Sequence, residues 1–274
     1  MRIAVSSWGY RKAFAAPCMA QGMDWPAFAR ETQAVGADGY EVHFGYLDRQ
    51  RLGQQYIWVT ELAQEQGLGV STLIAGNDFA VADVGERAQE IARFVDCIAA
   101  ARLSGVQRLN VFTGYHQEGQ DPAVERARVV DAYRRVMPVA EELGVVCCLE
   151  NHSSVVADID GLLELLYDVA SPNLVPNPDP TNVVHGYFQR EPSQEDVREV
   201  LDAAARFLPG AGNLHIKIDT FTDGKPDKVP MAEIVELAKD SHYDGWIVLE
   251  YCGQGDPRPI HAEAVPYLRS LWEA

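Results

Sequence analysis

Four side chains of the types that bind divalent metals lie in or shortly after successive apolar segments in the second half of the chain. They are Glu150, Asp179, His215 and Glu250. Three carboxylates brought to one place repel one another, and a divalent cation between them removes that repulsion. Oxygen and nitrogen ligands without thiolates suit one Mn²⁺, Mg²⁺, Co²⁺ or Zn²⁺ ion. We therefore predict a site for a single divalent metal ion, with manganese among the candidates.

Short apolar segments recur along the whole chain, and an amphipathic stretch follows each. The segments are Arg2–Ser6, Gly39–Val42, Gly69–Ile74, Arg108–Phe112, Val145–Leu149, Asn173–Pro176, Asn213–Ile218 and Trp246–Leu249. Such runs are typical of strands buried on both faces, and parallel neighbours need a crossover helix between them. Eight units of this kind in 274 residues predict an α/β fold, a single-domain (β/α)8 barrel over residues 1–274. In this fold the active site lies at the carboxyl ends of the strands, where the four side chains fall.

The overall composition restricts the class of protein. Lys and Arg number 23 against 40 Asp and Glu, which gives a net charge of −17 and argues against nucleic acid as a partner. The five cysteines form no C-x-x-C pair and no secretory leader opens the chain, so a reducing, cytoplasmic location is expected. No apolar run approaches the about 20 residues of a membrane helix. Oligomeric state is left open, and a homo-oligomer is one possibility.

Five short motifs carry a resemblance to a known family. They are GADGYEV (36–42), LENH (149–152), DPTN (179–182), LHIKID (214–219) and DGWIVLEY (244–251). In this order they resemble the xylose isomerase-like barrels, a group of sugar-phosphate isomerases and epimerases that includes ketose 3-epimerases, hydroxypyruvate isomerase, inosose-processing enzymes and, more distantly, endonuclease IV. The resemblance implies that the four predicted ligands bind one divalent ion. It further implies that Glu150 and Glu250 act as acid and base on opposite faces of a sugar, keto-sugar or sugar phosphate.

The chemistry of that group agrees with the residues present, with two departures. A metal that holds the carbonyl and a neighbouring hydroxyl oxygen stabilises the enediolate formed when a proton leaves the adjacent carbon. Where the ketose epimerases have a His and an Arg that hold substrate oxygens, this chain has Asn182 and Phe221. His185, farther along the same loop, is a candidate replacement. Two alternatives therefore stay open, a lyase or hydrolase of a 3-keto-glycoside with the same metal site and a sugar-binding barrel without turnover.

Several further residues are candidates for contact with the carbohydrate substrate. They are Trp8, His43, His152, His185, Lys217 and Asp219. Lys217 and Asp219 alternate with His215 along a predicted strand, so all three are expected to point inward. Lys217 would then face a phosphate or an oxyanion, or pair with Asp219 as a structural ion pair.

Three expectations concern the first half of the chain and the predicted histidine ligand. Glu41, in the second predicted strand, is placed to point inward and orient another group. A neutral His215 would bind the metal through one nitrogen, and its second nitrogen needs an orienting partner. The long first loop, residues 7–23, is expected to cover the mouth of the barrel or to be buried in an oligomer contact through Phe14 and Met19.

Overall fold

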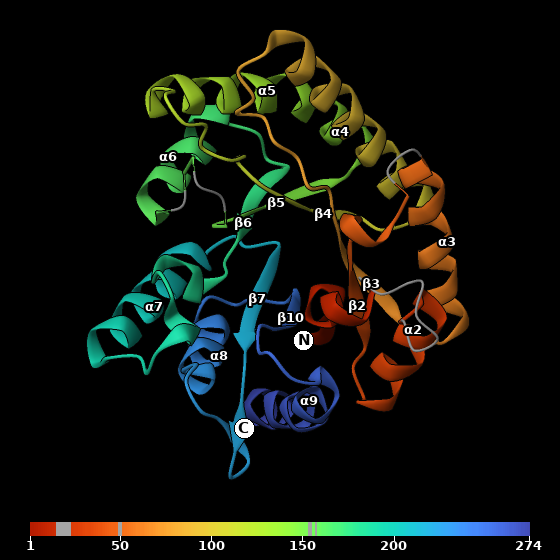
Figure 1. Cartoon of the computed structure of the whole chain (residues 1–274), viewed down its shortest axis with the longest axis vertical. Coiled ribbons are helices and arrows are strands. Elements are labelled where there is room, and N and C mark those ends of the chain that lie inside the picture. The colour runs from red at the N-terminus through yellow and green to blue at the C-terminus, as the bar shows by residue number, and fades with distance from the viewer. Residues whose placement is uncertain (15–22, 49–50, 153–154, 157) are drawn as a thin grey trace.

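The computed structural model describes residues 1–14, 23–48, 51–152, 155–156 and 158–274. Its central sheet has eight parallel strands in the order β6-β5-β4-β3-β2-β1-β10-β7, and helices surround it (Figure 1). This arrangement confirms the predicted (β/α)8 barrel. The strands are β1 (Arg2–Ser6), β2 (Gly39–His43), β3 (Gly69–Ile74), β4 (Arg108–Val111), β5 (Val146–Glu150), β6 (Leu174–Asn177), β7 (Asn213–Ile218) and β10 (Trp246–Tyr251).

The helices alternate with the strands as predicted. The long ones are α2 (Trp25–Ala34), α3 (Leu52–Glu65), α4 (Val84–Ser104), α5 (Pro122–Leu143), α6 (Ile159–Val169), α7 (Gln194–Phe207), α8 (Met231–Asp240) and α9 (Pro257–Glu273). Shorter elements are η1 (Ser7–Tyr10), α1 (Arg11–Phe14), η2 (Phe44–Tyr46), η4 (Pro180–Val183), η5 (Tyr187–Gln189) and the hairpin of β8 (Phe221–Thr222) and β9 (Lys225–Pro226). Aspartate side chains accept a backbone N–H at the N-caps of α2, α4, α5, α6 and α9 and so define where these helices begin.

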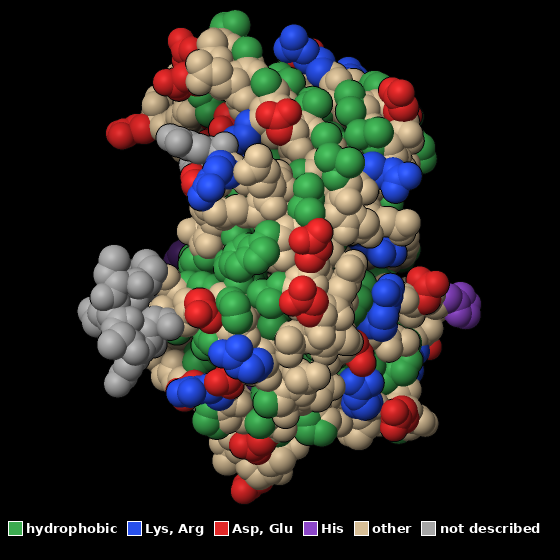
Figure 2. All heavy atoms as spheres, turned by 90° about the vertical axis from the view of Figure 1, so that its right-hand side faces the viewer, with side chains coloured by type: hydrophobic (Ala, Val, Ile, Leu, Met, Phe, Trp, Pro, Cys, Tyr) green, Lys and Arg blue, Asp and Glu red, His purple; other side chains and the backbone are tan. Residues whose placement is uncertain are grey.

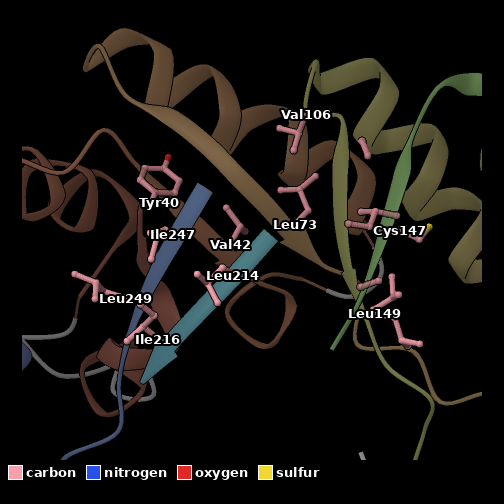
Figure 3. Packing of buried hydrophobic residues seen from close by; sticks show 14 of the residues in the cluster. Tyr40, Val42, Leu73, Val106, Cys147, Leu149, Leu214, Ile216, Ile247 and Leu249 are labelled. Atoms are coloured by element: carbon pink, nitrogen blue, oxygen red, sulfur yellow. The ribbon is translucent and has the colours of Figure 1, made fainter. Parts of the chain in front are cut away.

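The hydrophobic core lies between the barrel and its helices. Alternate side chains of each strand point outward into this layer, including Tyr40, Val42, Leu214, Ile216 and Leu249 (Figure 3). The other side chains of each strand point into the barrel, because successive residues of a strand face opposite sides. The interior therefore receives polar side chains wherever the sequence places them at these inward positions.

Trp246 fills the amino-terminal end of the barrel. It forms a small buried cluster with Ala4 and Val248, and the guanidinium of Arg2 lies 4.4 Å from its ring centre. The indole needs glycine opposite it, because a Cβ on Gly39 would lie 2.9 Å from Trp246 Cη2. The same Cβ would lie 2.2 Å from the carbonyl oxygen of Gly69 on the next strand. This end of the barrel is thus closed by packing, and the functional groups gather at the opposite end.

The barrel is nearly closed, and its seam lies between β6 and β7. No regular ladder joins these two strands, both of which lie in the described residues. Instead, the N–H of Gly212 donates to the carbonyl oxygen of Pro176, and the N–H of His215 donates to that of Pro178, each at 2.9 Å. In a strand, the N–H and the C=O of one residue point toward the same neighbouring strand. The residues whose backbone groups point toward β7 are prolines, which have a carbonyl oxygen to accept a hydrogen bond but no N–H to donate one.

The outer face of the barrel carries a mixed surface. Figure 2 shows the face that lies on the right of Figure 1, where hydrophobic side chains gather among acidic and basic ones. Large exposed hydrophobic side chains of α3 and α4 are Trp58, Val84 and Leu103. None of the helices in the described ranges combines the length and the apolar character needed to cross a membrane.

Candidate metal centre

The structure brings the four predicted ligand side chains together at the carboxyl ends of β5, β6, β7 and β10. His215 Nδ1 lies 3.7 Å from Glu150 Oε2 and 3.7 Å from Glu250 Oε2. Ligand atoms of Glu150, Asp179 and His215 all lie within 4.8 Å of one another. All four residues are buried. Ligand atoms of Glu41, His215 and Glu250 form a second group of this kind, and the two groups share His215.

The state of His215 Nδ1 tests whether these residues fit a metal. This nitrogen is buried and has no hydrogen-bond partner among the described residues, and such groups are rare in folded proteins. The other ring nitrogen, Nε2, lies 2.9 Å from Glu41 Oε1. With the proton on Nε2, the lone pair of Nδ1 is directed toward the space that Glu150 and Glu250 border. Together with three carboxylates, this donor set fits a divalent cation.

Glu41 supplies the orienting contact that a ligand histidine requires. It is fully buried and accepts hydrogen bonds from Ser6 Oγ at 2.7 Å and Thr72 Oγ1 at 2.6 Å. Burial by itself raises the pKa of Glu41, but the charge of His215 and the hydrogen bonds outweigh it and lower the pKa. The prediction that Glu41 points inward and orients another group is confirmed, and that group is His215.

The surrounding charges also set the proton affinity of the other site residues. Burial by itself lowers the pKa of His215. The negative charges of Glu41 and Glu150 outweigh burial and raise the pKa from 6.5 to about 10. A cation that binds Nδ1 replaces a proton there, so metal binding and proton release are coupled. Burial also raises the pKa of Glu250, and the charges of Asp179 and Glu150 add to this although Lys217 and His215 oppose it. Glu250 therefore holds a proton more readily than an exposed glutamate does.

Two asparagines hold the carboxylate of Glu150. Asn110 Nδ2, from β4, donates to Glu150 Oε2 at 2.7 Å, and Asn182 Nδ2, from η4, lies 3.4 Å from Glu150 Oε1. Asn110 is fully buried, and it was not among the residues predicted from the sequence. The signal was an asparagine inside an otherwise apolar strand, where an amide needs a polar partner.

A third asparagine positions Asp179, which has no regular strand around it. Asn151 Nδ2 donates to the carbonyl oxygen of Asp179 at 2.9 Å, and the N–H of Asp179 donates to Asn151 Oδ1 at 2.8 Å. Thr181 Oγ1 donates to Asp179 Oδ1 at 3.1 Å. The side-chain amide of Asn151 therefore forms the two hydrogen bonds with the backbone of Asp179 that a neighbouring strand would otherwise form. Its place directly after Glu150 was the signal that the sequence offered.

Lys217 contacts the carboxylates rather than its neighbour on the strand. Its Nζ forms an ion pair with Asp179 Oδ2 and lies 3.4 Å from Glu250 Oε1 and 2.8 Å from Asn182 Oδ1. The alternative pair of Lys217 with Asp219 is wrong, because Asp219 pairs with Lys228 at 3.0 Å. The strand β7 ends at Ile218, so the alternation that predicted an inward Asp219 stops one residue too early.

A cavity of about 860 Å³ adjoins the carboxylates. Lys217 and Asn182 belong to its lining, and both also touch the predicted ligands. His185 and Asp219 line it as well. Three of the predicted substrate-binding residues thus share one cavity beside the candidate metal centre.

These observations can be compared with known proteins. The family model of the xylose isomerase-like TIM barrel matches residues 23–271. The chain belongs to this family. No curated protein sequence matches the chain closely enough to count as a relative.

Solved structures of the xylose isomerase-like fold are similar over nearly the whole chain. D-psicose 3-epimerase from Clostridium cellulolyticum H10, solved with D-tagatose, has a TM-score of 0.71 and 16% identity and covers 100% of both chains. 3-keto-D-glucoside 4-epimerase from E. coli has a TM-score of 0.75 and 16% identity, with 98% of this chain and 99% of that chain covered. A family protein from Mycobacterium smegmatis in complex with magnesium has a TM-score of 0.70 and 18% identity, with coverage of 99% and 97%. At this identity the likeness shows the fold.

The two departures from the ketose epimerases of this family lie in different surroundings. Asn182 sits at the site, between Glu150 and Lys217. Phe221 lies in the hairpin strand β8, and its ring packs 5.5 Å from that of Tyr267 on α9. Neither position offers a cation, so the polar contacts of this site differ from those that the resemblance implied.

The remaining predicted substrate contacts lie outside the lining of this cavity. The rings of Trp8 and His43 are 4.9 Å apart, at the ends of β1 and β2. His152 is exposed, with its ring 5.5 Å from that of Phe112. In the first loop, Phe14 is buried in the hydrophobic core and stacks on Tyr46 at 4.7 Å. Met19 lies outside the described residues.

Proposed function

We propose that this chain is a divalent-metal-dependent isomerase or epimerase of a small sugar, keto-sugar or sugar phosphate. The observation that carries the proposal is the buried Nδ1 of His215, which makes no hydrogen bond among the described residues and lies 3.7 Å from a carboxylate oxygen of both Glu150 and Glu250. We assign the metal ligands as Glu150, Asp179, His215 and Glu250. The sugar epimerases among the structural neighbours support the reaction class. Mn²⁺, Mg²⁺, Co²⁺ and Zn²⁺ all suit this donor set.

In this proposal Glu150 and Glu250 move the protons. A bound divalent ion would supply a Lewis acid that draws charge toward the carbonyl oxygen of the substrate. The carboxylate of Glu150, held by Asn110 and Asn182, takes the proton from the carbon next to that carbonyl. Glu250, whose Oε2 lies 3.7 Å from His215 Nδ1, returns a proton from the other face. One C–H bond breaks and one forms, so no oxidant or reductant is needed.

The substrate would lie in the cavity beside Lys217, His185 and Asp219. We keep Trp8, His43 and His152, which do not belong to the lining of this cavity, as further candidate contacts. We expect the ammonium of Lys217 to face oxygen atoms of the substrate, since Lys217 belongs both to the lining and to the carboxylate cluster.

The proposal includes a cytoplasmic enzyme. The described cysteines, Cys97, Cys147, Cys148 and Cys252, are all unpaired, and free thiols are typical of reducing compartments. Cys18 lies outside the described residues.

Exchange of substrate hydrogen with solvent deuterium tests the reaction. Glu150→Gln should reduce exchange by about 10²–10⁴-fold, the usual contribution of a general base, in samples whose metal content is measured and saturated. Glu164→Gln, on the exposed face of α6, is the matched control and should exchange at the wild-type rate. Full activity of Glu150→Gln would refute the assignment. Release of an aglycone would identify a lyase instead, and bound metal without exchange would identify a sugar-binding barrel.

A further inference from the structure

We infer that the ammonium group of Lys217 takes the place of a second divalent ion and so limits the metal centre to one ion. The inference rests on the metal ligands assigned under the proposed function and concerns how many ions they bind. Three features of the site carry it: the oxygen atoms around the ammonium, the carboxylates shared with the predicted metal position, and the open space beside Lys217.

Among the described residues, oxygen atoms of three side chains surround Lys217 Nζ. This nitrogen forms an ion pair with Asp179 Oδ2, donates to Asn182 Oδ1 at 2.8 Å and lies 3.4 Å from Glu250 Oε1. Carboxylate and amide oxygens are also the ligands that suit Mg²⁺, Mn²⁺ and Ca²⁺. A position for a cation is therefore already formed around Nζ, and the chain fills it with a cation of its own.

Two carboxylates are shared between this position and the predicted position of the metal. Glu250 Oε2 lies 3.7 Å from His215 Nδ1, whereas Glu250 Oε1 faces Lys217 Nζ. Asp179 pairs with Lys217 and also belongs to the group of ligand atoms formed with Glu150 and His215. Neighbouring cation positions that share carboxylates are expected of a two-metal site, in which the ions lie about 3.5–4 Å apart.

The charges explain why the ammonium excludes a second ion. The carboxylates of Glu150, Asp179 and Glu250 carry three negative charges, which one divalent ion and one ammonium neutralise. A second divalent ion would meet the ammonium of Lys217 at contact distance, and like charges in a buried site repel each other. Without Lys217, the same carboxylates would carry one negative charge more than a single divalent ion neutralises.

The space beside Lys217 would admit an ion if the side chain were shortened. Lys217 and Asn182 line the cavity of about 860 Å³, and 12% of the Lys217 side chain is exposed. A methyl group in place of this side chain would open the three oxygen atoms to the cavity. Water molecules from the cavity would then complete the octahedral shell that Mg²⁺ and Mn²⁺ prefer.

The number of ions has a chemical consequence. Two-metal sites stabilise both the attacking and the leaving oxygen of a displacement, as in phosphatases and nucleases. Removal of a proton from the carbon next to a carbonyl uses one Lewis acid at the carbonyl oxygen. Lys217 therefore keeps the centre in the one-ion form that the proposed reaction uses.

Metal stoichiometry tests the inference without a substrate. In calorimetric titration with Mn²⁺, wild-type protein should bind one ion per chain and Lys217→Ala should bind two. Lys217→Met removes the charge but fills the same space, so it should bind one. Lys228→Ala is the matched control and should also bind one, because Lys228 Nζ contacts a single described carboxylate, that of Asp219, and the carbonyl oxygen of Phe188.

Electron paramagnetic resonance of the Mn²⁺-loaded proteins gives a second readout. Two ions this close couple magnetically, so Lys217→Ala should lose the spectrum of an isolated ion, which the other three proteins should keep. Lys217→Ala is purified with Mn²⁺ present, and circular dichroism checks its fold. Lys217→Ser, of similar size, replaces it if it does not fold.

One ion in the folded Lys217→Ala or Lys217→Ser protein would overturn the inference, and so would two coupled ions in the wild type. The wild-type titration does not depend on the folding of any variant. A wild-type protein that binds no Mn²⁺ would refute the proposed function instead. Gain of one ion by Lys217→Ala relative to that protein would still support the role of the ammonium.

Discussion

The imidazole of His215 and the carboxylate of Glu41 form a fully buried pair in which Nε2 and Oε1 lie 2.9 Å apart. The two residues belong to β7 and β2 and are 174 positions apart in the sequence. Because the pair occupies Nε2, the free nitrogen of the ring is the one that faces Glu150 and Glu250. Contacts of this kind fix the orientation and tautomer of a ligand histidine.

Glu41→Gln should weaken metal binding by about 10–100-fold, the usual effect of losing such a partner. The amide keeps the shape of the side chain but removes the charge opposite Nε2. Titration with Mn²⁺ measures the affinity, and circular dichroism checks that the barrel is folded. Thr72→Val removes one hydroxyl donor to Glu41 and leaves the pair intact, so its effect should be smaller. Wild-type affinity in Glu41→Gln would show that the pair does not serve the metal.

Lys217→Met should destabilise the protein in EDTA and tighten its binding of divalent metal. Without the ammonium, Asp179 and Glu250 lose the cation they share, and removing one partner of a buried ion pair costs about 3–5 kcal/mol. Added Mn²⁺ should restore most of the lost stability. Chemical denaturation with EDTA and with Mn²⁺ measures both effects.

Lys228→Met is the matched control for this experiment. It breaks the pair with Asp219, which does not include a predicted metal ligand. Its effect on stability should be the same with EDTA and with Mn²⁺. If Lys217→Met behaved like this control, the ammonium would have no part in the metal site.

His261 should make the barrel less stable in mild acid. Burial lowers its pKa from 6.5 to about 4, and the charge of Asp256 opposes only part of this. Between about pH 6.5 and pH 4 the unfolded chain binds a proton that the folded chain excludes. The free energy of unfolding is therefore unaffected by His261 above pH 6.5. It falls by about 3 kcal/mol in total as the pH decreases through this window.

Urea denaturation at pH 7 and pH 4.5 measures this loss. His261→Phe keeps a ring beside Tyr10 and should show a smaller drop between the two pH values. His242→Asn, at an exposed position, should show the wild-type drop. An unchanged drop in His261→Phe would assign the acid sensitivity to other groups.

Gly39→Ala should destabilise the barrel by about 3 kcal/mol or more, because the new Cβ would lie 2.2 Å from a backbone oxygen that cannot rotate away. Gly255→Ala is the control, since its nearest described atom would lie at 3.5 Å, an ordinary contact. Denaturation midpoints measure the difference. Equal midpoints would mean that β2 and β3 can move apart at Gly39 without a loss of stability.

The fold was predictable from the sequence because burial on both faces is a local property of each strand. The predicted ends of the strands were less accurate than their positions in the chain. Glu150 and Glu250 ended the apolar runs and were predicted to follow their strands, yet both lie within the ladders of β5 and β10. The predicted ligands could be found because strand ends converge in a barrel.

The partners of these ligands were harder to predict, since they depend on contacts between distant segments. Lys217 meets Asp179 across 38 positions, and Asn110 meets Glu150 across 40. Alternation along a strand tells which side a residue faces but not which residue lies opposite. The cavity walls come from loops after three strands, and no local pattern records how such loops fold against one another.

The proline-bordered seam links closure of the ring to the chemistry of the site. Asp179 lies on one side of this seam, and His215 and Lys217 lie on the other. Because two accepting carbonyls replace a full ladder there, the backbone contributes less cohesion at this edge than elsewhere around the ring. A cation shared by Asp179 and His215 would bridge the edges, so its affinity and the rigidity of the barrel would rise and fall together.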